Sequence, residues 1–287
     1  MLTAVFYAQL PRGHLLVCTW VGLALGVMLV HLCRQRWGHL TTVEALCNMS
    51  PLLFVVTIFQ RIGDMAPYLR REVDTLLIKV DLHLLGVHPT VWLERIMAPW
   101  LTDILSLAYV TYFFIPLILV GVLAFLGPPE KCALTAFTLL FGFYMAYLTY
   151  ILMPAVGPRY ALTAEQSTPL IGGPVAWYVM SLLDTLEYNK WDCFPSGHTQ
   201  IVLISLWFSY QCRRGLFWLY LPMVVALIIS TVYLRYHYVI DVVAGFLWAA
   251  AAIILAPMVW RTWVTKNTER SGRSYTSVPP RPLLPSA

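Results

Sequence analysis

Charged side chains are scarce in this sequence: only 11% of its 287 residues are charged, whereas 59% are hydrophobic. Soluble domains carry about 25% charged residues, so the composition excludes a soluble protein of this length. We therefore expect the chain to be integral to a membrane, where apolar side chains face lipid.

Cysteine motifs and targeting signals are also missing. The sequence has six cysteines and no C-x-x-C spacing, and all but Cys193 lie within or at the ends of apolar runs. There cysteine behaves as a small hydrophobe. No H-E-x-x-H occurs either. We therefore expect no disulfide framework, no metal site and no cofactor. Residues 1–11 lack a basic region and precede a run of spanning length, which argues against a cleavable signal peptide.

Seven apolar runs are long enough, or nearly so, to cross a hydrocarbon core of about 30 Å as helices. The second and fifth runs are the shortest. The predicted fold is therefore an all-α integral membrane protein, a bundle of six or seven transmembrane helices with interfacial helices, forming one domain over residues 1–264. The runs are His14–Cys33, Val43–Gln60, Leu101–Leu126, Cys132–Met153, Ser196–Cys212, Leu216–Leu234 and Tyr238–Trp260.

The loops between these runs differ in charge. With seven spans, ten basic and three acidic residues fall on one side of the membrane, and nine basic and eleven acidic residues on the other. The positive-inside rule assigns the first side, with the C-terminus, to the cytoplasm. The net charge of +5 thus reflects the excess of basic residues on the cytoplasmic side of the membrane, and we expect no nucleic-acid partner.

Three polar segments frame the spans. Residues 61–100 predict an interfacial segment, in which Gly86 ends one amphipathic helix and Pro89 begins another with Trp92 at headgroup level. We expect Asp74 and Asp81 to lie on a solvated face of the first helix, although they could touch a lipid headgroup. Val175–Leu186 predicts a further amphipathic helix, either a lid or a bilayer-surface element. Residues 265–287 predict a disordered basic tail.

The stretch Phe194–Thr199 joins a polar loop to an apolar helix. Ser196 is placed to cap that helix, whose first N–H groups carry the positive end of the helix dipole. Gly197 would let an anion approach the backbone, and His198 could protonate a leaving oxygen. A structural histidine at an ordinary helix start is the alternative.

Two other positions on the same side carry charge. The turn Met153–Tyr160 holds two prolines and a glycine, so it fixes Arg159 near the membrane surface. His237 and Asp241 are four residues apart, so on one helix they would share a face. Asp241 would then fix the ring tautomer of His237 and leave the other nitrogen free to attack a substrate. Arg235 adds a cation two residues earlier.

The stretches Phe194–Thr199 and His237–Gly245 resemble the second and third motifs of the type 2 phosphatidic acid phosphatase superfamily, and the likeness extends over residues 153–245. The resemblance implies that His237 forms a phosphohistidine with help from Asp241, and that His198 protonates the departing oxygen. It further implies that the phosphoryl oxygens are held without a metal by Ser196, Gly197, Arg159 and Arg235.

The sequence departs from that superfamily at two points. In the first motif Leu152 stands where a lysine is expected, and Tyr160 follows Arg159 in place of proline. In the third motif Thr231 stands where an arginine is expected. The turn at residues 153–160 and the position of Arg235 look more like the branch of inositol phosphorylceramide synthases.

These observations predict a membrane enzyme that acts on a lipid phosphate on the non-cytoplasmic face. We expect a phosphatase for a lipid phosphomonoester or polyprenyl diphosphate. An inositolphosphotransferase that moves the headgroup to a lipid alcohol is the second reading, and a lipid or anion transporter is the third. The sequence leaves the oligomeric state open.

Overall fold

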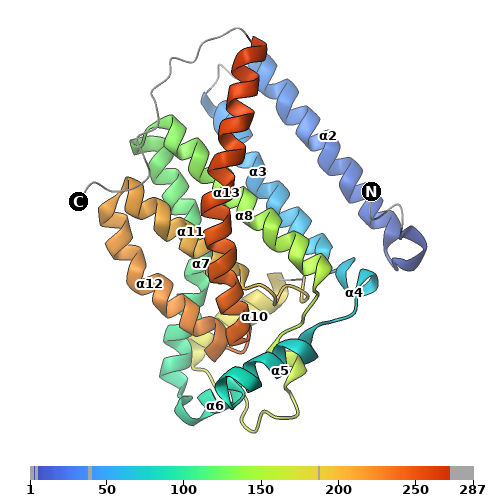
Figure 1. Ribbon diagram of the computed structural model, residues 1–287, viewed down its shortest axis with the longest axis vertical. Helices are drawn as coiled ribbons and strands as arrows, with labels where there is room; N and C mark the ends of the chain where they lie inside the picture. The colour runs from blue at the N-terminus through green and yellow to red at the C-terminus, as the bar shows by residue number, and fades with distance from the viewer. Residues whose placement is uncertain (1–2, 4–5, 38–40, 187, 272–287) are drawn as a thin grey trace.

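The chain folds as a bundle of helices in this computed structural model, which describes residues 3, 6–37, 41–186 and 188–271 (Figure 1). No strand occurs among these residues, so the all-α prediction is confirmed. The elements are η1 (Tyr7–Gln9), α2 (Gly13–Trp37), α3 (Thr41–Ile62), α4 (Ala66–Leu69), α5 (Asp74–Leu85), α6 (Pro89–Trp92), η2 (Leu93–Ile96), α7 (Pro99–Leu126), α8 (Pro129–Leu152), α9 (Pro158–Ala161), α10 (Pro174–Leu186), α11 (Gly197–Cys212), α12 (Arg214–Tyr233) and α13 (Val239–Ser271).

All seven apolar runs are helical. Among the described residues five helices are long and apolar enough to span a membrane, namely α2, α7, α8, α12 and α13. The pair of α5 with the segment Pro89–Ile96, bent by 63°, would make a sixth. At 16 residues, α11 is about 24 Å long and shorter than the hydrocarbon core. The chain is an integral membrane protein with five or six candidate spans.

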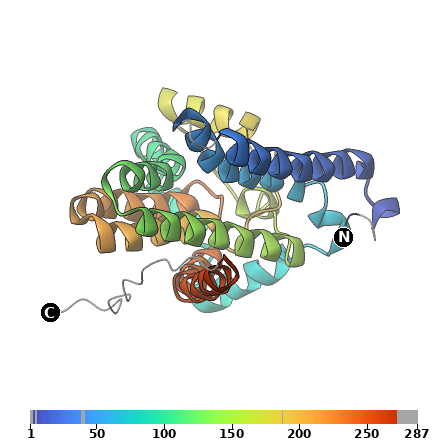
Figure 2. The same ribbon diagram turned by 90° about the horizontal axis from the view of Figure 1, so that it is seen from above.

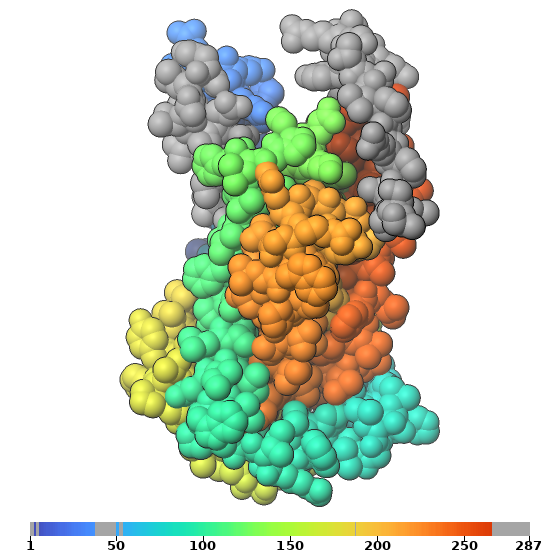
Figure 3. Space-filling view, turned by 90° about the vertical axis from the view of Figure 1, so that its left-hand side faces the viewer, coloured from blue at the N-terminus to red at the C-terminus, as the bar shows by residue number. Residues whose placement is uncertain are grey.

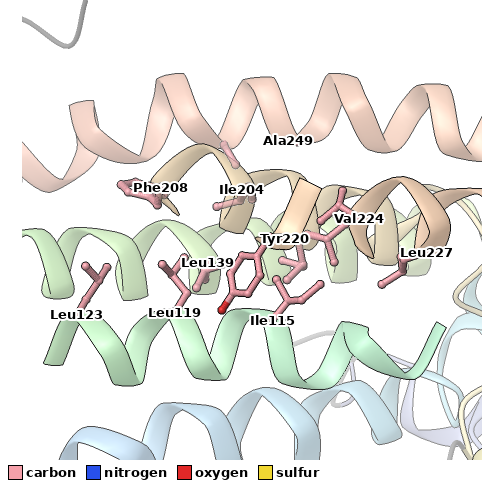
Figure 4. Close-up of a cluster of buried hydrophobic side chains, with 13 residues drawn as sticks. Ile115, Leu119, Leu123, Leu139, Ile204, Phe208, Tyr220, Val224, Leu227 and Ala249 are labelled. Carbon is pink, nitrogen blue, oxygen red and sulfur yellow. The ribbon is translucent and has the colours of Figure 1, made fainter. Parts of the chain in front are cut away.

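The centre of the bundle is α11, which packs against α7, α8, α12 and α13. These helices bury a common apolar cluster that includes Ile115, Leu139, Ile204, Val224 and Ala249 (Figure 4). On one side of the bundle α2 lies along α3, and α3 packs against α8 (Figure 2). Because its neighbours surround it, α11 can begin with polar residues within the protein and away from lipid.

The predicted surface helices lie at the lower end of the molecule. Figures 1 and 3 show α5 and α6 at this end and α10 projecting from one side of the lower half. Gly86 ends α5 in a left-handed conformation with φ of 71°, and Pro89 begins α6, as predicted. The Val175–Leu186 prediction agrees with α10 to within one residue.

Two predictions about the surroundings are wrong. Asp74 and Asp81 are not on a solvated face: they are 3% and 2% exposed, on the face of α5 that packs against the protein, while the apolar Leu76 and Leu84 are exposed. Their carboxylates bind backbone N–H groups, which compensates their burial. The predicted tail also begins too early, since α13 continues to Ser271. The rest of the predicted tail lies outside the described residues.

Candidate active site

The start of α11 is built as the sequence predicts. Ser196 is the N-cap, and its hydroxyl oxygen accepts hydrogen bonds from the Thr199 N–H at 3.3 Å and the Thr199 hydroxyl at 3.0 Å. The Ser196 N–H donates to the backbone carbonyl of Asp241 at 3.0 Å. That bond joins the two motif stretches, 45 residues apart in sequence, at one point of the fold.

Gly197 has a packing requirement that the sequence did not reveal. A Cβ atom at this position would collide with the hydroxyl of Tyr150, a buried residue of α8. The absence of a side chain therefore brings α8 and the start of α11 together. Its predicted role in letting an anion reach the backbone stays a prediction.

His237 lies just before α13, and a backbone carbonyl orients its ring. Its Nδ1 lies 2.8 Å from the carbonyl oxygen of Cys193. Because a carbonyl only accepts, Nδ1 carries the proton and Nε2 carries the lone pair in the neutral ring. This Nε2 lies 3.3 Å from Nδ1 of His198, which can donate to it. The two histidines therefore meet, and Nε2 of His237 becomes available as a nucleophile when the rings separate.

The predicted hydrogen bond from His237 to Asp241 is not formed. The Asp241 carboxylate lies 3.6 Å from His237 Nδ1 and accepts instead from the Tyr238 N–H and the Cys193 thiol, both at 2.8 Å. The reason is local: His237 precedes the first turn of α13, so the helical spacing of four residues does not apply to the pair. Asp241 caps the helix and stays near enough to stabilise a positively charged ring.

Cys193, the one cysteine outside the apolar runs, contacts both motifs. Its carbonyl orients His237 and its thiol donates to Asp241. Burial, and then the neighbouring Asp241 carboxylate, raise the pKa of the thiol well above its usual range, so the sulfur remains a neutral donor. Because Cys193 directly precedes Phe194, its position in the sequence could have indicated that it lies at the site.

His198 is buried among aromatic rings. Its ring centroid lies 4.5 Å from that of Tyr109 and 4.2 Å from that of Tyr112, both on α7. Its Nε2 has no hydrogen-bond partner among the described residues. Both tyrosines belong to the third apolar run, Leu101–Leu126.

A cavity of about 30 Å³ lies beside the two histidines. Its volume holds about two water molecules, so a phosphoryl group requires the lining to move apart. The lining residues are Tyr109, Val156, Arg159, Tyr160, Asn189, Lys190, Asp192, Cys193, His198, Tyr236 and His237.

Arg159 reaches this cavity, as predicted, and α10 holds it in place. Its guanidinium donates two hydrogen bonds to the carboxylate of Asp184, at 3.1 and 3.0 Å, and one to the Tyr236 hydroxyl at 3.2 Å. Asp184 is the only acidic residue of α10, which was the signal that could have identified it. The guanidinium is thus paired with a carboxylate that a phosphate could replace.

Arg235 points elsewhere and does not line the cavity. Its guanidinium, almost fully buried, donates to Glu94 at 2.8 Å, to the Thr168 carbonyl at 2.7 Å and to Gln166 at 2.9 Å. Its backbone has φ of 64° at the end of α12, in the left-handed position that glycine usually occupies. Arg235 therefore joins the end of α12 to η2 and to the loop at residues 166–168. The convergence with the histidines expected from sequence is not observed.

Asp192 is a cavity residue that the sequence analysis did not consider. Burial raises its pKa to about 6, although His237 opposes that shift. At pH 7 such a carboxyl group is still mostly ionised, and it becomes neutral as the pH falls below about 6. Asp192 stands two residues before the Phe194 motif.

Three of these groups could also hold a metal. The ligand atoms of Cys193, His237 and Asp241 lie within 4.8 Å of one another. Each already takes part in a hydrogen bond in this arrangement, and the thiol is protonated. Metal binding would break these bonds, so the donor set fits a hydrogen-bonded nucleophile better than a metal centre. The absence of a metal stays a prediction.

Comparisons with known proteins show the family to which the chain belongs. A family model described as the PAP2 superfamily matches residues 75–255, more than half of the chain. The matched region begins in α5 and includes both histidines, Arg159 and Asp241. No curated protein and no solved structure matches the chain.

Proposed function

Given that this chain belongs to the PAP2 superfamily, we propose that it is a lipid-phosphate phosphatase acting through a phosphohistidine on His237. The substrate class is a lipid phosphomonoester or a polyprenyl diphosphate. The observation that carries the proposal is the ring of His237, whose Nδ1–H is fixed by the Cys193 carbonyl while Nε2 faces His198 beside the cavity reached by Arg159.

The reaction follows from these positions. His237 Nε2 attacks phosphorus, and the bond from phosphorus to the leaving oxygen breaks as His198 gives that oxygen a proton. Asp241 stabilises the positive phosphoimidazole ring from 3.6 Å. Water then attacks the phosphohistidine, gives a proton to His198 and releases phosphate. Neither step requires a metal.

Groups close to the two histidines would bind the phosphoryl oxygens. Arg159 would exchange Asp184 for two phosphoryl oxygens, because its planar fork binds either group in the same way. The N–H groups at the start of α11, including that of Gly197, and the Ser196 hydroxyl would complete the set. Because the two histidine nitrogens are only 3.3 Å apart, the rings must separate when phosphorus approaches Nε2.

Trapping the phosphoenzyme tests the proposal. Purified protein in lipid nanodiscs is mixed with phosphatidic acid or polyprenyl diphosphate labelled with ³²P, quenched in alkali and separated on a gel. We expect an alkali-stable, acid-labile label on the wild type and none on His237→Ala, with turnover reduced on the order of 10⁴-fold. His198→Ala should lose about 10²- to 10⁴-fold. His83→Ala, at an exposed histidine of α5, is the matched control. Phosphate release by His237→Ala at the wild-type rate would refute the mechanism.

Transfer to a lipid alcohol is the second candidate, favoured by the likeness of the Met153–Tyr160 turn to the branch of inositol phosphorylceramide synthases. The same assay with labelled phosphatidylinositol, with and without ceramide, separates the two activities. A headgroup that appears only on the acceptor lipid would replace the phosphatase assignment by inositolphosphotransferase. Lipid flip-flop in vesicles without any phosphate release, persisting in His198→Ala, would instead indicate a transporter.

The proposal places the cavity on the non-cytoplasmic face because the loops at the other end carry the excess of basic residues. Protease protection of a C-terminal tag in sealed, oriented cell vesicles tests this orientation. A tag that is cleaved from the non-cytoplasmic side would reverse it.

A further inference from the structure

The buried face of α5 carries two carboxylates that the proposed reaction does not use. Asp74 and Asp81 are seven residues apart, so they lie two turns apart on one face, with the buried Leu77 between them. No lysine or arginine pairs with either carboxylate in the part of the chain that the structure describes. Backbone groups bind them instead.

Asp74 holds the turn that leads to Arg159. Its two carboxylate oxygens accept from the N–H groups of Val156 and Gly157, both at 2.9 Å. The turn depends on Gly157, which has φ of 86° and comes close to the Tyr236 carbonyl. Val156 itself lines the cavity. The depth of Arg159 is therefore set from α5.

Asp81 holds the segment that follows His237. Its oxygens accept from the N–H groups of Val239 and Ile240, both at 2.8 Å, at the positive end of α13. The Tyr238 hydroxyl donates to Asp74 at 2.9 Å, which links the two anchors. The residue beside His237 is thus tied to the carboxylate that also holds the Arg159 turn.

A neutral cap would satisfy the same N–H groups with less desolvation than a buried carboxylate. A buried carboxylate holds the backbone more firmly than a neutral cap does. A charged acceptor binds N–H groups about twice as strongly as a neutral one, and a contact through two oxygens fixes direction as well as distance. Since a displacement of about 1 Å can cost on the order of 10²-fold in rate, firm placement of His237 and Arg159 has a catalytic consequence.

We propose that Asp74 and Asp81 are positioning residues that hold the segments carrying Arg159 and His237 at a fixed separation. Neither carboxylate lines the cavity, so both act through the backbone they bind. The inference rests on the proposed phosphoryl transfer, whose chemical step would then depend on α5.

Asp74→Asn, Asp81→Asn and the milder Tyr238→Phe, which removes only the hydroxyl contact with Asp74, test the inference. Asp64→Asn is the matched control, because Asp64 is also buried and its partners are the side chains of Arg12 and Arg61. For each variant in nanodiscs we would measure Tm, kcat and KM with phosphatidic acid, and the Kd values of vanadate and inorganic phosphate.

The two aspartate variants should lose about 10- to 100-fold in kcat with KM changed less than about threefold. Vanadate, which mimics the five-coordinate transition state, should bind more weakly by the same factor, while binding of inorganic phosphate stays constant. Tyr238→Phe should show the same pattern at about two- to fivefold, and Asp64→Asn should lower Tm without changing kcat per folded molecule.

A fall in Tm with normal kcat per folded molecule in the aspartate variants would overturn the inference, as would equal weakening of vanadate and phosphate. If the wild type releases no phosphate from any lipid, the proposed function fails. The difference between vanadate and phosphate binding then still decides the inference. A wild type that binds neither anion would overturn both proposals.

Discussion

The helices α5 and α10 lie at the same end of the molecule and both expose apolar side chains, yet they hold the candidate site in different ways (Figures 1 and 3). The buried carboxylates of α5 bind backbone N–H groups, whereas α10 offers Asp184, whose side chain is 43% exposed, to the side chains of Arg159 and Lys190. A buried carboxylate has no other partner to move to. An exposed ion pair contributes about 0–1 kcal/mol and exchanges readily. We therefore expect α5 to hold its segments of the site in fixed positions, and α10 to hold Arg159 by a contact that can exchange.

The largest effect is expected from removal of the Arg159 side chain, which Asp184 of α10 holds. If Arg159 leaves Asp184 to bind the phosphoryl group, Arg159→Ala should lower kcat/KM about 10²- to 10³-fold. Arg159→Lys should recover only part of the rate, because an ammonium group lacks the planar fork. Steady-state kinetics with phosphatidic acid measures both. Arg70→Ala removes an exposed arginine near α5 and should change the rate less than about twofold. Equal losses in Arg159→Ala and Arg70→Ala would mean that the overall positive charge of the protein affects the rate and that Arg159 does not bind the phosphoryl group directly.

A second test concerns Asp192, which lines the cavity itself. The pKa of Asp192 in the folded protein is about 6, compared with the usual 3.8, with burial as the main cause. The folded protein therefore keeps a proton that the unfolded chain has lost in this window, and stability should fall as pH rises from about 4 to 6. Asp192→Asn removes this penalty, on the order of 3 kcal/mol above pH 7.

Thermal unfolding of the wild type and Asp192→Asn from pH 4 to pH 8 measures that effect. The two Tm values should agree near pH 4, and the variant should be more stable above pH 7. A constant difference across the range would show that Asp192 titrates normally, as an exposed carboxylate does.

The smallest effect is expected when Arg159 loses its partner on α10. Asp184→Asn should change the free energy of unfolding by less than about 1 kcal/mol. It should also lower KM up to about threefold, because phosphate no longer competes with a carboxylate for Arg159. Denaturation and substrate titration of the same preparation provide both values. A loss of activity above about tenfold would show that Asp184 positions Arg159 as firmly as the α5 carboxylates hold their segments, and the two helices would then not differ in this respect.

The sequence alone determined the membrane class, the helical fold and the positions of the long helices, because each depends on local composition and spacing. It also predicted the cap at Ser196, the end of α5 at Gly86 and, to within one residue, the helix α10 as Val175–Leu186. These features follow from the chemistry of one or a few neighbouring residues.

Only the tertiary structure decided which groups meet. Sequence spacing paired His237 with Asp241, but the chain brings the Cys193 carbonyl to His237 and leaves Asp241 as the cap of α13. Asp74 and Asp81 read as surface residues because a helical pattern does not show what packs on each face. Arg235 pairs with Glu94, 141 residues away in sequence, and spacing within the Arg235–Asp241 stretch could not predict that contact. Contacts between segments far apart in sequence depend on how the helices pack, and spacing along one segment carries no information about them.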